Sequence, residues 1–176
     1  KIVLQLIPYP KHDLLMLVPF RSLEQAGEAV SAIFRAGFTP SAMELVEINA
    51  LKIVSRMVES SAVQVTDDIE AHLIIEVDGN DMEVLMKEME AISELLTQYA
   101  IGEIYFADDA QQKAELWKLR RKVAEAVKLD GYTIEEDTVV PRAALPALIK
   151  AVKEVGRKHD FAVVCYGHAG DGNLHI

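Results

Sequence analysis

The chain has 176 residues, of which 51% are hydrophobic and 26% are charged, values typical of a globular domain. Its formal net charge of −10 argues against a nucleic-acid-binding role, because binding to phosphates requires a basic surface. No apolar run approaches the roughly 20 residues that cross a bilayer. A single cysteine, Cys165, excludes an internal disulfide and leads us to expect a reducing, cytoplasmic setting.

The first half of the sequence predicts the order β-α-β-β-α-β between residues 13 and 106. Ser22 is a plausible helix N-cap, Gly37 stands where a helix ends, and residues 78–81 form a turn and a second cap. A short helix at 49–59 is expected before a polar loop. The expected strands are 13–20, 42–48, 71–77 and 101–106, and the two main helices carry residues 23–33 and 85–99.

This order is typical of a ferredoxin-like split βαβ unit, an α+β fold with an antiparallel sheet and helices on one face. The second half predicts a helix at 109–128, a strand at 134–140, a helix opened by Pro141 and a strand at 161–166. It resembles the first half, as though the unit were duplicated and then truncated at its C-terminus. We therefore expect two halves, 1–106 and 107–176.

Residues 173–176 read as the middle of a strand, and the sequence does not begin with methionine. Domains rarely end inside a strand, because the pairing of that strand is then incomplete. We expect the second half to be incomplete and the sequence to be a piece of a longer protein.

A tight turn is expected at Asp171-Gly172, since this dipeptide favours a two-residue type I′ hairpin. Such a turn pairs His168 with His175 across the two strands, with their Cβ atoms about 5 Å apart on one face. Alternation places Tyr166 and Asn173 on that face as well, and Cys165 on the opposite, buried face.

Two imidazoles at this separation can share a divalent metal ion. Zinc in catalytic sites takes three protein ligands, so at least one more ligand must come from elsewhere. The alternative is that the two histidines are polar neighbours on an exposed strand face, with glycines present for the turn. The spacing alone leaves both interpretations open.

Residues 167–175, Gly-His-Ala-Gly-Asp-Gly-Asn-Leu-His, resemble the GHxGDGNLH motif of the FAD-linked oxidase C-terminal domain. That domain occurs in glycolate oxidases, D-lactate dehydrogenases and D-2-hydroxyglutarate dehydrogenase. Residues 116–120 and 136–142 agree with the family in order and spacing. The resemblance implies the substrate-side cap domain of an FAD-dependent 2-hydroxy-acid oxidoreductase, inactive by itself.

The resemblance also implies roles for single residues. Arg120 matches the arginine that pairs with a substrate carboxylate, and His168 and His175 match ligands of a metal, usually zinc. Asp137 and Asn173 are expected on the flavin side. In the whole enzyme a base removes the hydroxyl proton while hydride passes from C2 to the flavin, and an electron acceptor then reoxidises the flavin.

Two departures bear on the substrate. Related 2-hydroxyglutarate enzymes carry threonine where Ala124 stands and lysine where Glu135 stands. The loss of a hydroxyl and the reversal of a charge favour a monocarboxylate such as lactate or glycolate. GxGxxG and Walker-type phosphate loops are absent from the sequence, so we expect FAD to be bound mainly by a domain that this chain does not contain.

Two other functions compete with this interpretation. A ferredoxin-like regulatory module of the amino-acid-sensing kind binds its ligand beside a glycine after the first strand, but residues 20–23 contain none. It would also leave the two histidines unexplained. A zinc hydrolase is the other alternative, and the sequence lacks the HExxH pair that many of these enzymes use.

Overall fold

The computed structural model describes residues 2–6, 8–57 and 66–176, in which seven antiparallel strands form one sheet of order β4-β1-β3-β2-β6-β7-β5. Five α-helices and two short 3₁₀ turns connect the strands. The strands are β1 (His12–Phe20), β2 (Ala42–Glu47), β3 (Ala71–Gly79), β4 (Tyr105–Ala107), β5 (Asp137–Val139), β6 (Tyr166–Gly167) and β7 (Asn173–His175). The helices are α1 (Leu23–Arg35), α2 (Ile48–Val54), α3 (Met82–Leu96), α4 (Ala110–Leu129) and α5 (Leu145–His159).

The order β4-β1-β3-β2, with α1 and α3 in the two crossovers, is that of the ferredoxin-like unit predicted for the first half. The predicted caps are also confirmed. The Ser22 hydroxyl accepts a hydrogen bond from the Gln25 amide, and the Asp81 carboxylate accepts from the amides of Glu83 and Val84. The second half adds β6, β7 and β5 to the same sheet beyond β2.

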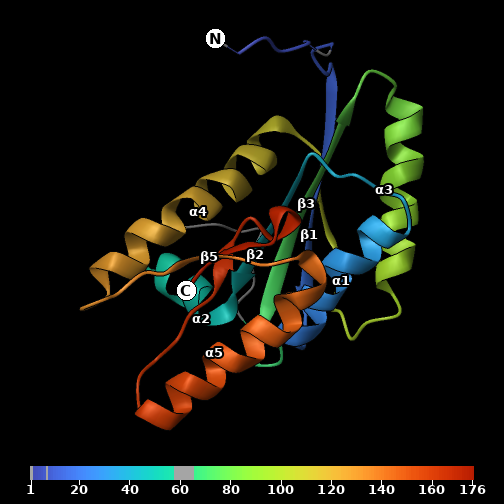
Figure 1. Cartoon of the computed structure of the whole chain (residues 1–176). Helices are drawn as coiled ribbons and strands as arrows, with labels where there is room; N and C mark the ends of the chain where they lie inside the picture. The colour runs from blue at the N-terminus through green and yellow to red at the C-terminus, as the bar shows by residue number, and fades with distance from the viewer. Residues whose placement is uncertain (1, 7, 58–65) are drawn as a thin grey trace.

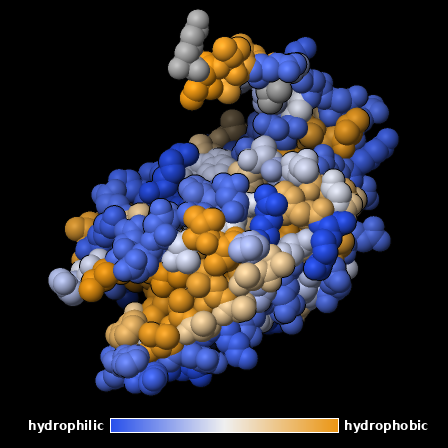
Figure 2. Space-filling view, viewed as in Figure 1, coloured by the Kyte–Doolittle hydropathy of each residue, from blue (hydrophilic) through white to orange (hydrophobic). Residues whose placement is uncertain are grey.

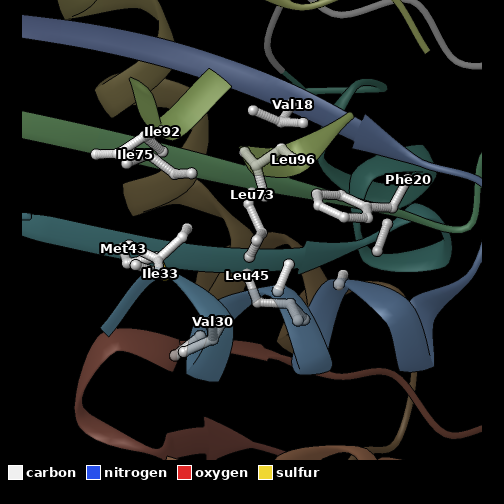
Figure 3. Packing of buried hydrophobic residues seen from close by; sticks show 14 of the residues in the cluster. Val18, Phe20, Val30, Ile33, Met43, Leu45, Leu73, Ile75, Ile92 and Leu96 are labelled. Carbon is white, nitrogen blue, oxygen red and sulfur yellow. The ribbon is translucent and has the colours of Figure 1, made fainter. Parts of the chain in front are cut away.

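Apolar side chains between the sheet and the helices α1, α3 and α5 form the main core. Figure 3 shows Leu73 and Leu45, from neighbouring strands, pointing toward one another and toward Val30 of α1. The pattern follows the strand period of two, since alternate residues of β1, β2 and β3 face this side. The residues labelled in Figure 3 are Val18, Phe20, Val30, Ile33, Met43, Leu45, Leu73, Ile75, Ile92 and Leu96.

Helices α2 and α4 cover the opposite face of the sheet. Leu116 of α4 packs with Leu15 and Ile74, which are the other set of alternating strand residues. The expectation of helices on one face therefore holds for α1 and α3, whereas α4 adds a third layer on the other side (Figure 1). No helix in the described ranges is long and apolar enough to span a membrane.

Three predicted strands are shorter than expected, and the one predicted at 134–140 is observed only as β5. Residues 101–104 make only one isolated bridge, between Ile101 and Phe20, and β4 begins at Tyr105, because β1 contains Pro19, which has no N–H to donate to a partner strand. Residues 161–165 do not pair as a strand. Instead, the Glu47 side chain accepts the Cys165 amide, and that side chain takes the place of a backbone acceptor. The predicted helix at 49–59 is observed as the shorter α2, which ends at Val54, and residues 58–65 lie outside the described ranges.

The turn between β6 and β7 differs from the predicted two-residue hairpin. A type I′ turn needs positive φ at both central residues, but only Gly172 has one, at 75°, and Asp171 instead ends a 3₁₀ turn that begins at Ala169. The amide of Asn173 donates to the carbonyl of His168, which closes the longer loop. His175 consequently pairs with Tyr166, not with His168.

The imidazole of His72 is buried in β3, with 3% of the residue exposed. Burial lowers the pKa of His72 from 6.5 to about 4. The unfolded chain therefore binds a proton more tightly than the native chain as the pH falls from about 6.5 to about 4. This contribution to stability is complete above pH 6.5 and is lost toward pH 4.

We predict that the protein loses about 3 kcal/mol more unfolding free energy between pH 7 and pH 4 than its His72→Gln variant loses. Urea unfolding at both pH values measures this difference. His159→Gln, which changes an exposed histidine, is the control and should follow the parent. Equal pH dependence in the parent and in His72→Gln would contradict the prediction.

Gly172 allows the loop to approach β5 closely. A Cβ atom at this position would overlap the carbonyl oxygen of Val140, whose amide donates to the carbonyl of Gly172. We predict that Gly172→Ala lowers the unfolding free energy by about 3 kcal/mol or more, from backbone strain and the clash together. Gly37→Ala is the matched control, since Gly37 has φ of 92° with no atom near its added Cβ, and should cost only about 1 kcal/mol. Equal losses in urea unfolding would contradict the prediction.

Candidate functional site

Five side chains form a closed ring of contacts on the α4 side of the sheet, where β2, β6 and β7 lie next to one another. In Figure 1 the labelled β2 and β5 lie between α4 above and α5 below. Strand alternation turns Glu44 and Val46 of β2 toward α4, while Met43 and Leu45 face the main core. The members of the ring are Glu44, Arg120, Tyr166, His168 and His175.

Glu44 joins two members of the ring. Its Oε2 accepts a hydrogen bond of 2.8 Å from Nε of Arg120, and its Oε1 lies 2.7 Å from Nδ1 of His168. Glu44 is 6% exposed and Arg120 8% exposed, so the ion pair is buried. Because a carboxylate only accepts hydrogen bonds, the proton of neutral His168 resides on Nδ1 and its Nε2 keeps a lone pair.

The aromatic members close the ring. The guanidinium of Arg120 lies 5.9 Å from the centroid of the Tyr166 ring, within cation–π range. Tyr166 stacks on His175 with 5.3 Å between centroids, and His175 lies edge-on to His168 at 6.3 Å. The two histidines therefore come together as predicted, although the pairing that does it is the one between Tyr166 and His175.

Unsatisfied polar atoms concentrate here. Five buried side-chain nitrogen or oxygen atoms in the described ranges lack a hydrogen-bond partner, and three of them belong to Arg120, Asn173 and His175. Nη2 of Arg120 lies 2.8 Å from Glu44 Oε2, but at an angle that gives no hydrogen bond. Buried polar atoms are nearly always paired in native proteins, so such a concentration indicates a place where another molecule supplies the partners.

Glu135, just before β5, extends the ring on the His175 side. Its Oε1 lies 3.0 Å from Nδ1 of His175 and its Oε2 lies 2.7 Å from the Lys128 ammonium. The hydrogen bond from Lys128 lowers the pKa of Glu135. The site therefore carries an ionised carboxylate next to His175.

The residues present fit two ligands of a metal ion. His168 and His175 each have Nδ1 next to a carboxylate, the arrangement that orients metal-binding imidazoles and leaves Nε2 available. Two imidazoles on one tetrahedral zinc have centroids about 5 Å apart, so the observed 6.3 Å requires a closure of about 1 Å. No group of three or more histidine, cysteine, aspartate or glutamate side chains in the described ranges could hold a metal.

Asp137 and Asn173 lie at the edge of the ring, on β5 and β7. The Asn173 amide nitrogen donates to Asp137 at 2.8 Å, and Asp137 Oδ1 is 3.9 Å from Nδ1 of His175. Cys165 is fully buried in the main core, as its place on the opposite strand face predicts, and burial raises its pKa to about 12. Trp117 packs near Leu116, and its indole N–H donates to Glu76.

Sequence reasoning missed Glu44. The strand Ala42–Glu47 reads AMELVE, and a charged residue among apolar ones in a buried strand is the only local signal. Its partners follow 76 and 124 residues later, too far for any sequence period to connect them.

Comparison with known proteins identifies the family of this chain. Residues 9–176 match the family model described as FAD linked oxidases, C-terminal domain. The chain is 30% identical to D-lactate dehydrogenase of Anaerostipes hadrus over 181 aligned positions, covering all of this chain and 38% of that protein. It is 28% identical to glycolate oxidase subunit GlcD of Bacillus subtilis, covering 98% of this chain and 36% of that one.

A solved structure of alkyldihydroxyacetonephosphate synthase has the same fold, with a TM-score of 0.65 and 17% identity, over 94% of this chain and 35% of that chain. The chain thus spans little more than a third of the length of its relatives. The family predicted from the GHxGDGNLH motif is confirmed by a match that also includes the first half. This chain belongs to the family of FAD linked oxidase C-terminal domains.

Proposed function

We propose that the chain is the substrate-side cap domain of a larger FAD-dependent oxidoreductase, which oxidises a 2-hydroxy acid with one carboxylate, such as D-lactate or glycolate. One observation supports the proposal most directly. At the ring of contacts, buried polar atoms of Arg120, Asn173 and His175 lack hydrogen-bond partners. The names of the relatives, D-lactate dehydrogenase and glycolate oxidase subunit GlcD, support the substrate class. In this proposal residues 1–106 and 107–176 are two halves of the cap, and the FAD-binding domain lies elsewhere in the protein.

Arg120 binds the substrate carboxylate. Its Nε is occupied by Glu44, and the Nη2 group that lacks an aligned partner is available for a charge-assisted hydrogen bond. The guanidinium is planar and held between Glu44 and the ring of Tyr166, so little orientational freedom is lost when the substrate binds.

His168 and His175 face the hydroxyl end of the substrate. Glu44 takes the Nδ1 side of His168, so Nε2 of that ring is free as an acceptor. Nδ1 of His175 lies 3.0 Å from Glu135 without an aligned hydrogen bond. A divalent metal bound by both would lower the pKa of the substrate hydroxyl, with its remaining ligand supplied from outside this chain. FAD, held mainly by a domain outside this chain, would supply the hydride acceptor, while this chain contributes orientation and charge.

Glu135 favours a monocarboxylate. Its carboxylate lies against His175 and is kept ionised by Lys128, so a second carboxylate of a dicarboxylic substrate would meet a like charge there. Ala124 lies on α4, partly buried against apolar side chains of β2, α2 and α4, and offers no hydroxyl to such a group.

The remainder of the protein covers the flavin side of the cap, beside Asp137 and Asn173. Figure 2 shows hydrophobic side chains gathered between α5 and the C-terminal strands, on the face that carries the C-terminus. Exposed apolar residues of this part of the chain include Ile134, Val139 and Phe161. Such an area is more apolar than a free surface normally leaves open, which supports a covering domain. The proposal also includes an electron acceptor that reoxidises the reduced flavin, and it places the protein in the cytoplasm.

The full-length protein should be yellow and should reduce a dye when given D-lactate or glycolate. In that assay Arg120→Lys should lower kcat/KM by about 100-fold or more, mainly through KM, because a point charge cannot replace the guanidinium that is bonded to Glu44 and faces the carboxylate. Lys122→Arg, on the exposed side of the same helix, is the control and should match the parent. A colourless protein without dye reduction would reject the proposal, and parent-like kinetics of Arg120→Lys would remove Arg120 from the site.

Metal content tests the two histidines. We expect the full-length protein to hold a divalent metal that is lost in His168→Ala and retained in His159→Ala, since His159 is exposed at the end of α5. Elemental analysis of dialysed protein measures the ratio of metal to flavin. Equal metal in both variants would show that His168 is not a ligand.

A further inference from the structure

We propose that Glu44 is the positioning residue of this site: its one buried carboxylate orients Arg120 toward the substrate carboxylate and holds His168 in the tautomer that leaves Nε2 free. The proposal rests on the proposed function. Glu44 touches neither end of the substrate. It acts through the two groups that do.

The first contact sets the direction of the guanidinium. Arg120 reaches Glu44 from α4, which covers this face of the sheet, with both Nε and Nη2 at 2.8 Å from the same carboxylate oxygen. Only the Nε contact has hydrogen-bond geometry, so Nη2 is held near Glu44 with its hydrogens directed elsewhere. A buried arginine whose N–H groups are not all hydrogen-bonded can bind a second anion, and Glu44 determines the direction of those N–H groups.

The second contact sets the state of the imidazole. Oε1 of Glu44 lies 2.7 Å from Nδ1 of His168, whose side chain is otherwise half-exposed on a loop. A carboxylate at this distance accepts a hydrogen bond from Nδ1–H and fixes the orientation of the imidazole ring. Nε2 is then the atom that can bind a metal or accept a proton.

The two contacts together couple the ends of the site. Oε2 serves the arginine and Oε1 serves the histidine, so neither partner can shift without moving the same carboxylate. A substrate whose carboxylate and hydroxyl are on neighbouring carbons requires its two binding groups at a constant separation. A single rigid carboxylate on a central strand provides that constancy better than two side chains positioned separately.

Glu47 offers a matched control on the same strand. It is also a buried carboxylate, 3% exposed, and accepts hydrogen bonds from Lys153, Asn49 and the amide of Cys165. In the described ranges its side chain makes no hydrogen bond or ion pair with a member of the ring. Replacing it with glutamine therefore carries a comparable structural cost without touching the site.

The tautomer of His168 is the first readout, and it does not depend on turnover. Arg120 can only donate, so in Glu44→Gln the amide oxygen must face Arg120 and the amide nitrogen must face His168. Nδ1 of His168 then has to accept, and the proton moves to Nε2. Nitrogen NMR of metal-free, full-length protein with labelled histidine, assigned with His168→Ala, should show this exchange in Glu44→Gln and the parent tautomer in Glu47→Gln and Glu44→Asp.

Steady-state kinetics with a 2-hydroxy acid are the second readout. Glu44→Gln should lower kcat and raise KM, with kcat/KM reduced about 100-fold, because both ends of the site lose their orientation. Glu44→Asp keeps the charge but shortens the side chain, so its kcat/KM should fall by about 10-fold, to a value between those of the parent and Glu44→Gln. Glu47→Gln should stay within about 3-fold of the parent.

The outcomes separate the two proposals. An unchanged His168 tautomer in Glu44→Gln, or kinetics equal to those of Glu47→Gln, would overturn the role of Glu44. A parent enzyme that oxidises no 2-hydroxy acid would reject the proposed function, while the NMR measurement would still decide what Glu44 does. If Glu44→Gln does not fold, Glu44→Asp decides: kinetics indistinguishable from the parent at equal thermal stability would overturn the proposal.

Discussion

A carboxylate buried in a β-strand is costly unless every oxygen finds a donor, and the arrangement around Glu44 follows from this constraint. One oxygen is taken by a buried arginine from α4 and the other by a histidine from the loop after β6. The charge of Glu44 offsets that of Arg120, and each makes the burial of the other tolerable. Tyr166 lies against Arg120, and His175 closes the ring between Tyr166 and His168.

The sheet provides the frame for this interaction. The pairing of Leu45 with Gly167, at the junction of β2 and β6, joins the ferredoxin-like strands to those of the second half. Since alternate residues of β2 face opposite sides, Leu45 enters the main core while Glu44 faces α4. The candidate site thus lies where strands from both parts of the chain meet. The pairing of β2 with β6 extends the sheet and also brings Glu44 close to its partners.

The proposed anion site is compatible with the acidic composition of the chain. The net charge of −10 describes the whole surface, whereas the field inside a buried site depends on the few groups that water does not screen. Arg120 is one of these groups, and its Nη2 is a buried atom without a hydrogen-bond partner. Glu135 and Lys128 then set the charge on the other side of His175, where the proposal places the limit on substrate size and charge.

The sequence by itself determined the ferredoxin-like order, the helix caps and the nearness of His168 to His175. The order follows from the spacing of hydrophobic residues along each element, and the caps and the nearness of the histidines depend on residues only a few positions apart. Only the tertiary structure decided the register of the last strands, since Asp171 entered a 3₁₀ turn in place of the left-handed conformation that a two-residue hairpin requires. It also decided the partners of Glu44, which lie 76 and 124 residues away. No local pattern encodes such a contact: it exists only once the strands have paired and α4 has covered them.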